Sequence, residues 1–296
     1  MKLPRPLAKL DHLLVRDGPA HTHALVRTGL AVAILVRLAI RQWWLASRQP
    51  KAFFDPVFAV RWLHGVPPIG VLVAVQLVGA VAAAAAVLGR RVSISLPVAW
   101  ISYVFLAGIW SSDGKILHNE VLLILATVPF LFASSGAHLG DRTESSRWGW
   151  PTRTSTILIG AVYFTAGVQK LRHSGLAWVT SDNMRWILYG AARTSRSPLP
   201  SLARHLADIA WLSHLLAFGL LALELTAPVI LFFRRSRPWF FATAVALHGG
   251  TWMLLGLDYW AWIMCVGVVT LLGMGVALAP HGRTWPRVRA TEAAPG

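Results

Sequence analysis

The chain has 296 residues, of which 55% are hydrophobic and only 14% are charged. A soluble domain carries about 25% charged residues, so this composition excludes an ordinary soluble protein. The apolar residues fall in repeated runs close to the roughly 20 residues that a helix needs to cross a bilayer core. We therefore expect an all-α polytopic membrane protein, a bundle of about eight transmembrane helices.

The formal net charge of +16 does not indicate a nucleic-acid partner. The basic residues lie mostly between apolar runs, where lipid headgroups and membrane topology account for them. Fifteen tryptophans, several at the ends of apolar runs, are typical of an interfacial aromatic belt. The one cysteine, Cys265, lies in an apolar run, which excludes an intrachain disulfide and a cysteine-based metal cluster.

The apolar runs divide the chain into a bundle at residues 24–280, preceded by residues 1–23 and followed by a basic tail at residues 281–296. The first segment is broken by Pro and Gly and lacks the pattern of a cleavable signal peptide, so the first apolar run is expected to act as an uncleaved anchor. The predicted helices cover residues 24–46, 69–88, 93–110, 116–132, 154–171, 208–233, 239–255 and 259–278.

Topology follows from the distribution of Lys and Arg on alternate sides of these helices. The side that takes the N-terminal segment, Arg90, Arg91, the basic turn at residues 234–237 and the tail carries the larger share. We therefore expect both termini to be cytoplasmic, in a multi-pass protein of the plasma (cytoplasmic) membrane. Residues 172–207 then form an outer loop, in which Trp178 and Trp186 stand among polar residues as in interfacial helices.

Polar residues at membrane depth cost several kcal/mol unless they are paired or solvated, so each needs a reason. They occur at four places in the apolar runs, and those nearest the outer side are expected to share one outward-facing cavity. The polar residues are Lys115, His118, Asn119 and Glu120; Tyr163, Gln169, Lys170 and His173; His214 and Glu224; and His248.

Several of these residues have two interpretations. Lys170 is either an interfacial anchor or a partly desolvated amine that acts as a base. Glu224 either pairs with Arg37 or Arg41, or handles a ligand or proton. His248 is more often a hydrogen-bonding residue between helices than a ligand. No spacing motif supports a zinc site from the histidines, and no metal is expected.

Residues 163–171 (YFTAGVQKL), followed by Trp178, resemble the core motif of the HTTM domain. This is the multi-span domain of vitamin K-dependent γ-glutamyl carboxylase and its bacterial relatives. Further similar features follow in the same order and extend the resemblance over nearly all of residues 24–280. They are residues 118–120 (HNE), Asp141, residues 224–228 (ELTAP), and His248 in the helix after the arginine-rich turn.

The resemblance implies a chemistry for this site. In the carboxylase, the lysine of the motif is the proposed base that deprotonates reduced vitamin K, and Lys170 is the matching residue. The family also uses a histidine at the start of the preceding helix; this chain reads His118-Asn119 where the carboxylase reads Asn-His, so Asn119 takes the position of that histidine. We expect catalysis from Lys170, His118 and Asn119, with a reduced, vitamin K-like quinone as cofactor. The residues expected to bind substrate are Tyr163, Trp178, His214, Glu224 and His248.

The chain also differs from the carboxylase in length. The long lumenal region that helps the carboxylase bind its protein substrate has no counterpart after residue 280, so a protein substrate is not expected. Two functions stay open. One is an HTTM-type enzyme that acts on a quinol or another lipid-soluble substrate by lysine-base chemistry. The other is a non-catalytic membrane protein that binds or passes lipids or small solutes, or scaffolds a partner.

Overall fold

The computed structural model describes residues 15–112, 118–133, 136–194 and 196–276. Their regular secondary structure is helical apart from one antiparallel pair of two-residue strands, β1 (Gly18–Pro19) and β2 (Glu144–Ser145). The α-helices are α2 (Ala20–Ile40), α3 (Ile69–Val87), α4 (Val92–Trp110), α5 (Val121–Leu131), α6 (Ser146–Ser174), α7 (Ala177–Thr180), α8 (Asn183–Ala192), α9 (Pro200–Asp208), α10 (Ala210–Phe232), α11 (Arg237–Leu255) and α12 (Trp260–Leu271). Short 3-10 helices are η1 (Trp43–Arg48), η2 (Lys51–Phe53), η3 (Phe58–Val60), η4 (His118–Glu120), η5 (Arg234–Ser236) and η6 (Leu272–Gly275).

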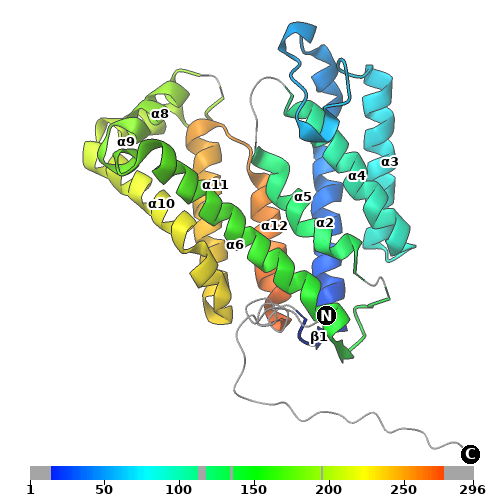
Figure 1. The fold of residues 1–296 in the computed structure, drawn as a ribbon. Coiled ribbons are helices and arrows are strands. Elements are labelled where there is room, and N and C mark those ends of the chain that lie inside the picture. The colour runs from blue at the N-terminus through cyan, green and yellow to red at the C-terminus, as the bar shows by residue number, and fades with distance from the viewer. Residues whose placement is uncertain (1–14, 113–117, 134–135, 195, 277–296) are drawn as a thin grey trace, which may run out of the picture.

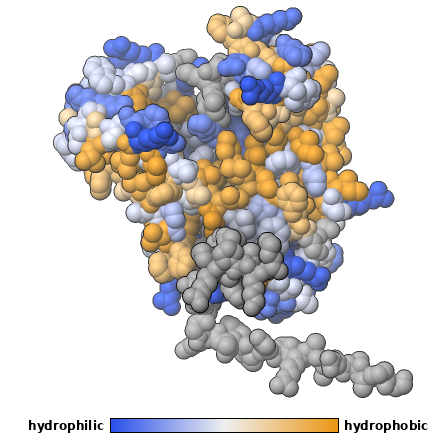
Figure 2. Space-filling view, viewed as in Figure 1, coloured by the Kyte–Doolittle hydropathy of each residue, from blue (hydrophilic) through white to orange (hydrophobic). Residues whose placement is uncertain are grey.

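The long helices run up and down in alternation as one bundle (Figure 1). The two ends of the described chain meet, because Gly18 lies beside the side chain of Val276. We call this the terminal end of the bundle, and the opposite end, which holds α8, α9 and the loop between α11 and α12, the distal end (Figure 1). On the face shown in Figure 2, hydrophobic residues gather over the middle and hydrophilic residues at both ends, as a bilayer requires.

Within the described residues, four helices are long and apolar enough to cross a membrane: α2, α3, α4 and α10. The helices α6 and α11 are long enough, but their polar residues lower their hydropathy. The apolar stretches at His118–Leu131 and Trp260–Gly275 are shorter. The structure therefore shows a helical bundle with four helices able to cross a membrane among the described residues, whereas the number of eight crossings stays a prediction.

Several helix boundaries differ from those predicted: the last helix, predicted at residues 259–278, is α-helical only for Trp260–Leu271, and two other differences have identifiable tertiary contacts. The first helix ends at Ile40 rather than at residue 46, and Trp43 in the following 3-10 turn donates its indole N–H to the Arg37 carbonyl at 3.1 Å. The helix predicted at residues 154–171 extends from Ser146 to Ser174. Its added first turns are held in place because Arg153 is buried and donates to the Asp17 carbonyl at 2.8 Å. Both of these boundaries depend on tertiary contacts, which cannot be inferred from local sequence preference.

The predicted outer loop is helical. Its helices α8 and α9 pack against each other through Leu188, Ala192, Ala203 and Ala207. An ion pair between Arg185 and Asp182, 2.9 Å apart, lies on the surface of α8. The loop thus forms a small layer over the distal end of α10 and α11 (Figure 1).

Candidate functional site

The site begins with the close contact between α6 and α10. Gly160 faces Pro228, and Gly167 faces Glu224 and Leu225. The two glycines are two helical turns apart and therefore share one face of α6. Small residues on one face allow two membrane helices to approach closely. A Cβ atom on Gly167 would lie only 3.1 Å from the Glu224 Cβ atom, so the glycine is what allows Glu224 to sit against α6.

One turn beyond Gly167, Lys170 forms an ion pair with Glu224. The Lys170 ammonium donates to both carboxylate oxygens, at 2.6 and 2.8 Å. The Lys170 side chain is 21% exposed and that of Glu224 is 8% exposed, so the pair opens to the surface on its lysine side. The pairing of Glu224 with Arg37 or Arg41, one of the two sequence interpretations, is wrong.

Trp178 covers this ion pair. It comes from α7, which follows the turn at Gly175, and its ring centroid lies 5.4 Å from the Lys170 ammonium. The Trp178 Nε1 atom is buried, and none of the described residues accepts a hydrogen bond from it. A buried N–H group without an acceptor is costly, and a ligand oxygen can provide the acceptor.

A second polar pair lies about two turns further into the bundle. The Tyr163 hydroxyl and His248 Nε2 are 2.7 Å apart, and both side chains are buried. The rings of Tyr259 and Trp262 pack against His248 at centroid distances of 5.1 and 5.3 Å. This is the hydrogen bond between helices that the structural interpretation of His248 predicted, and it places His248 beside Tyr163 in one wall of aromatic side chains.

The residues at the start of α5 reach this wall through the backbone. The Trp262 indole N–H donates to the His118 carbonyl at 2.9 Å. Asn119 is buried, whereas the His118 side chain is exposed. Lys115 lies outside the described residues.

His214 does not join the other polar groups. It stands on α10 about 15 Å from Glu224 along the helix axis, at 1.5 Å per residue. The predicted cavity that collects Lys170, His118 and His214 is therefore not one compact cluster in the described structure. No three His, Cys, Asp or Glu side chains among the described residues are placed to hold a metal ion.

A second charged cluster, which the sequence did not predict, lies at the same distal end. Glu120 accepts hydrogen bonds from Arg37, from Arg41 at 2.8 Å and from the Tyr103 hydroxyl. Asp258 accepts from the Arg37 guanidinium at 2.8 and 3.1 Å and from Arg41 at 3.1 Å. We call Arg37, Arg41, Tyr103, Glu120 and Asp258 the arginine network.

The arginine network balances two arginines against two carboxylates. Paired charges of opposite sign can be buried in a membrane bundle, whereas burying a single unpaired charge is costly. The available signal was Asp258, the one acidic residue between Arg237 and Val276, which stands in a short loop between two apolar helices. Burial raises the pKa of Asp258, but the hydrogen bonds and charges of Arg37 and Arg41 outweigh burial and hold that pKa below its ordinary value.

The network borders the site through neighbouring residues. Asp258 precedes Tyr259, which packs on His248, and Glu120 follows Asn119. The arginine network therefore fixes the loop between α11 and α12 and the start of α5, both of which contribute to the wall around Tyr163 and His248.

Comparison with known proteins identifies the family. The family model described as the HTTM domain matches residues 18–273, nearly the whole chain. Searches of curated proteins and of solved structures find no match. The match covers every element of the site, from the arginine network through the Lys170–Glu224 pair to Trp262, and the chain belongs to the HTTM domain family.

Proposed function

We propose that this HTTM-domain protein is a membrane enzyme that removes a proton from the hydroxyl of a quinol or of another lipid-soluble substrate. The observation that carries the proposal is the Lys170–Glu224 pair at the distal end of α6, buried on its glutamate side and open on its lysine side. We further propose that it works in the plasma membrane, with both termini cytoplasmic and the pair near the outer surface.

The pair can accept a proton without burying a new unpaired charge. Lys170 donates to both oxygens of Glu224, so its ammonium can pass a proton to the carboxylate and leave a neutral amine that accepts the substrate proton. When a substrate hydroxyl gives up its proton, the pair changes from neutral to singly positive and the substrate oxygen becomes negative beside the ammonium. The total charge is unchanged, and the ammonium stabilises the anion in surroundings of low dielectric constant.

Two neighbouring groups support an aromatic or quinone-like ligand. The Trp178 N–H has no hydrogen-bond acceptor among the described residues and can donate to a substrate oxygen. The Tyr259 ring, partly exposed and packed on the buried Trp262, gives an aromatic surface against which a planar ring can pack. A reduced quinone of the vitamin K type, the cofactor that the family resemblance implies, would supply the oxidisable hydroxyl.

The test compares Lys170→Ala, Lys170→Arg and wild type in liposomes with added menaquinol. General acid–base catalysis typically contributes about 10²–10⁴-fold, so both variants should lose at least about 100-fold of the oxygen-dependent consumption of the quinol. Lys170→Arg keeps the ion pair but has no readily removable proton, so it should fold and remain inactive. Arg172→Ala removes an exposed charge only two residues further along α6; it is the matched control and should keep activity.

Mass spectrometry of co-purifying small molecules provides a second measurement. A quinone present with wild type and Arg172→Ala, and absent with Lys170→Ala, would support a quinone site at Lys170. If Lys170→Arg retains full activity, the lysine is an anchor or structural partner and the enzyme proposal is wrong. If wild type neither carries a quinone nor consumes menaquinol faster than empty liposomes, a non-catalytic role in lipid or solute binding is favoured.

A further inference from the structure

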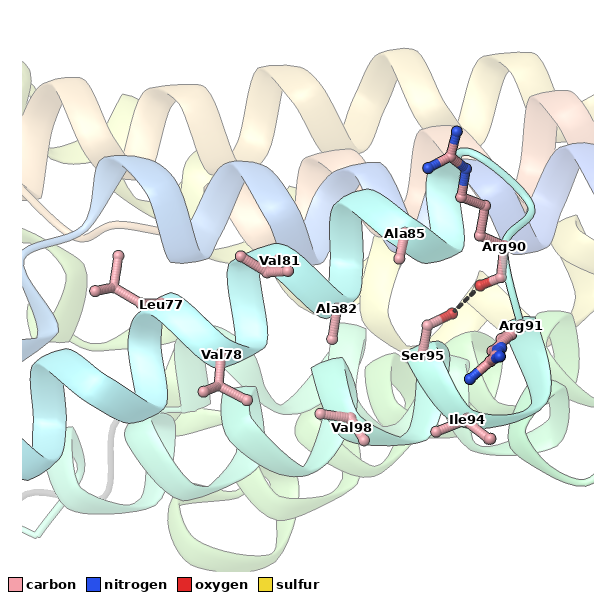
Figure 3. A pocket seen from close by; sticks show the side chains of 10 residues that line it. All are labelled: Leu77, Val78, Val81, Ala82, Ala85, Arg90, Arg91, Ile94, Ser95 and Val98. Atoms are coloured by element: carbon pink, nitrogen blue, oxygen red, sulfur yellow. Dashed lines mark hydrogen bonds between the residues drawn. The ribbon is translucent and has the colours of Figure 1, made fainter.

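The outer face of the α3–α4 hairpin carries an apolar groove, away from the Lys170 site. Its volume is about 850 Å³, and its walls come from Leu77, Val78 and Val81 of α3 and Ile94 and Val98 of α4 (Figure 3). Leu77, Val78, Val81 and Ile94 are each more than half exposed. On a membrane-spanning hairpin, such a surface faces lipid chains.

The groove has a basic end. Arg90 and Arg91 line it at the turn between α3 and α4, beside Ser95 (Figure 3). The Ser95 hydroxyl donates to the Arg90 carbonyl at 3.0 Å, which fixes the turn. Both arginine side chains are exposed. The Arg91 side chain lies toward Ile94, whereas the Arg90 side chain extends away from the groove and reaches a headgroup there by rotating (Figure 3).

The backbone of Arg91 is unusual. It has φ of +44° in the left-handed region, and it is the only residue other than glycine with positive φ among those described. Glycine adopts this conformation without steric cost, whereas a residue with a Cβ atom does not. The strain is tolerated at Arg91 although glycine would avoid it. We take this as a sign that the arginine side chain has a function at this turn.

The dimensions fit one lipid leaflet. The apolar stretch from Leu77 to Ala85 spans about 12 Å along α3, at 1.5 Å per residue. One leaflet contributes about half of the 30 Å hydrocarbon core. A chain lying in the groove therefore places its headgroup at the level of Arg90 and Arg91. The first N–H groups of α4 face the same turn and add favourable potential for an anion.

We propose that this groove is a binding site for an anionic phospholipid. One acyl chain lies between α3 and α4, and the lipid phosphate pairs with Arg90 and Arg91. The charge complementarity and the chain-length groove distinguish it from the general lipid-facing surface, on which no headgroup is selected. The site does not depend on the proposed enzymatic activity, because none of its residues belongs to the Lys170 site or the arginine network.

The first test measures lipid binding to the detergent-purified full chain by native mass spectrometry and by melting temperature. The probes are dioleoyl phosphatidylglycerol, dioleoyl phosphatidylcholine and inorganic phosphate. Each basic residue near a membrane surface contributes enough that removing two should weaken binding about 30-fold. Arg90→Gln with Arg91→Gln should therefore lose the phosphatidylglycerol-dependent rise in melting temperature. The control, Arg234→Gln with Arg235→Gln, removes two exposed arginines from η5 and should keep it.

Two further variants separate the chain contact from the headgroup contact. Ala85→Phe fills the groove without changing charge and should lower phosphatidylglycerol binding about tenfold. Arg91→Gly relieves the backbone strain, so it should raise the melting temperature of the lipid-free protein while lowering its response to phosphatidylglycerol.

Three results would overturn the proposal. Equal binding of phosphatidylcholine would show lipid contact without headgroup selection. Competition by inorganic phosphate with no effect of Ala85→Phe would show a phosphate site rather than a lipid site. An equal loss in the Arg234 and Arg235 control would show a general effect of surface charge.

Discussion

Lys170 and Glu224 illustrate how a membrane bundle can hold reactive charges. Each is costly alone at membrane depth, and each satisfies the other through two hydrogen bonds of 2.6 and 2.8 Å. The lysine is partly open to the surface and lies under Trp178, while the glutamate is nearly covered. In the proposed reaction, this asymmetry directs the substrate to the lysine rather than to the glutamate.

The energetic coupling of this pair can be measured by a double-mutant cycle. Lys170→Met leaves the Glu224 carboxylate buried without its partner, which should lower the free energy of unfolding by about 1–3 kcal/mol. The double variant Lys170→Met with Glu224→Leu replaces both charges by apolar groups and should recover most of this loss. Chemical denaturation in mixed micelles would measure both. If the losses in unfolding free energy of Lys170→Met and Glu224→Leu simply add in the double variant, a direct interaction between the two residues is contradicted.

At the scale of elements, the contact of α6 with α10 depends on two glycines. Gly160 and Gly167 let Pro228 and Glu224 approach the backbone of α6. In the family motif, Gly167 and Lys170 are three residues apart and lie on adjacent turns of α6. Gly167 permits the close approach of α10, and Lys170 forms the ion pair that this approach allows. The close packing and the ion pair are therefore one structural unit.

Gly167→Ala should disturb this unit. The new Cβ atom would lie 3.0 Å from the Leu225 side chain and 3.1 Å from the Glu224 Cβ atom, closer than ordinary contacts. We expect a lower melting temperature and at least a tenfold loss of the activity proposed above, equivalent to about 1.4 kcal/mol. Gly219→Ala, on the open side of α10 with nothing within 4 Å, is the matched control and should be neutral or slightly stabilising. Equal effects of the two variants would contradict a specific role for Gly167.

The arginine network makes a prediction about pH, again at the scale of elements, because it ties the α11–α12 loop to α2. Arg37 and Arg41 hold the pKa of Asp258 below its ordinary value of about 3.9. A carboxyl group whose pKa is lowered on folding stabilises the protein above its unfolded pKa, and this contribution is lost as pH falls through the folded pKa. The melting temperature of wild type should therefore exceed that of Asp258→Asn at pH 5–7, and the difference should shrink below about pH 4.

A difference between wild type and Asp258→Asn that stays constant down to pH 3 would contradict this linkage. Comparing the two proteins at each pH isolates the contribution of Asp258, because the two chains differ only at that residue.

At the scale of the whole molecule, the two ends of the bundle carry different sets of charged residues. The terminal end holds the α3–α4 turn with Arg90 and Arg91 and the basic turn η5. The distal end holds the helices of the outer loop (Figure 1), the α11–α12 loop with Asp258, and the last turns of α6 with Lys170. This polarity matches the distribution of basic residues that predicts a cytoplasmic terminal end.

Labelling of introduced cysteines can test this orientation. Ser181→Cys, on the distal loop, should react with a membrane-impermeant maleimide in intact cells. Arg234→Cys, in the turn η5, should react only after the cells are permeabilised. The native Cys265 is buried and should give little background. The reverse pattern would invert the predicted topology.

The sequence by itself determined the class of the protein and most of its helices. Long apolar runs predict spanning helices because a buried backbone in lipid must satisfy its own hydrogen bonds. The ends of α3, α4, α10 and α11 were predicted closely because Pro, Gly or Arg interrupt the apolar pattern there. The motif around Lys170 also indicated the family.

Only the tertiary structure decided which charges meet. Glu224 pairs with Lys170 across α6 and α10, and Arg37 pairs with Glu120 and Asp258, which are far apart in sequence. Buried charges need partners of opposite sign, but the sequence allows several different pairings of its arginines and carboxylates. The choice depends on where close helix contacts, such as that at Gly167, bring the side chains within hydrogen-bonding distance.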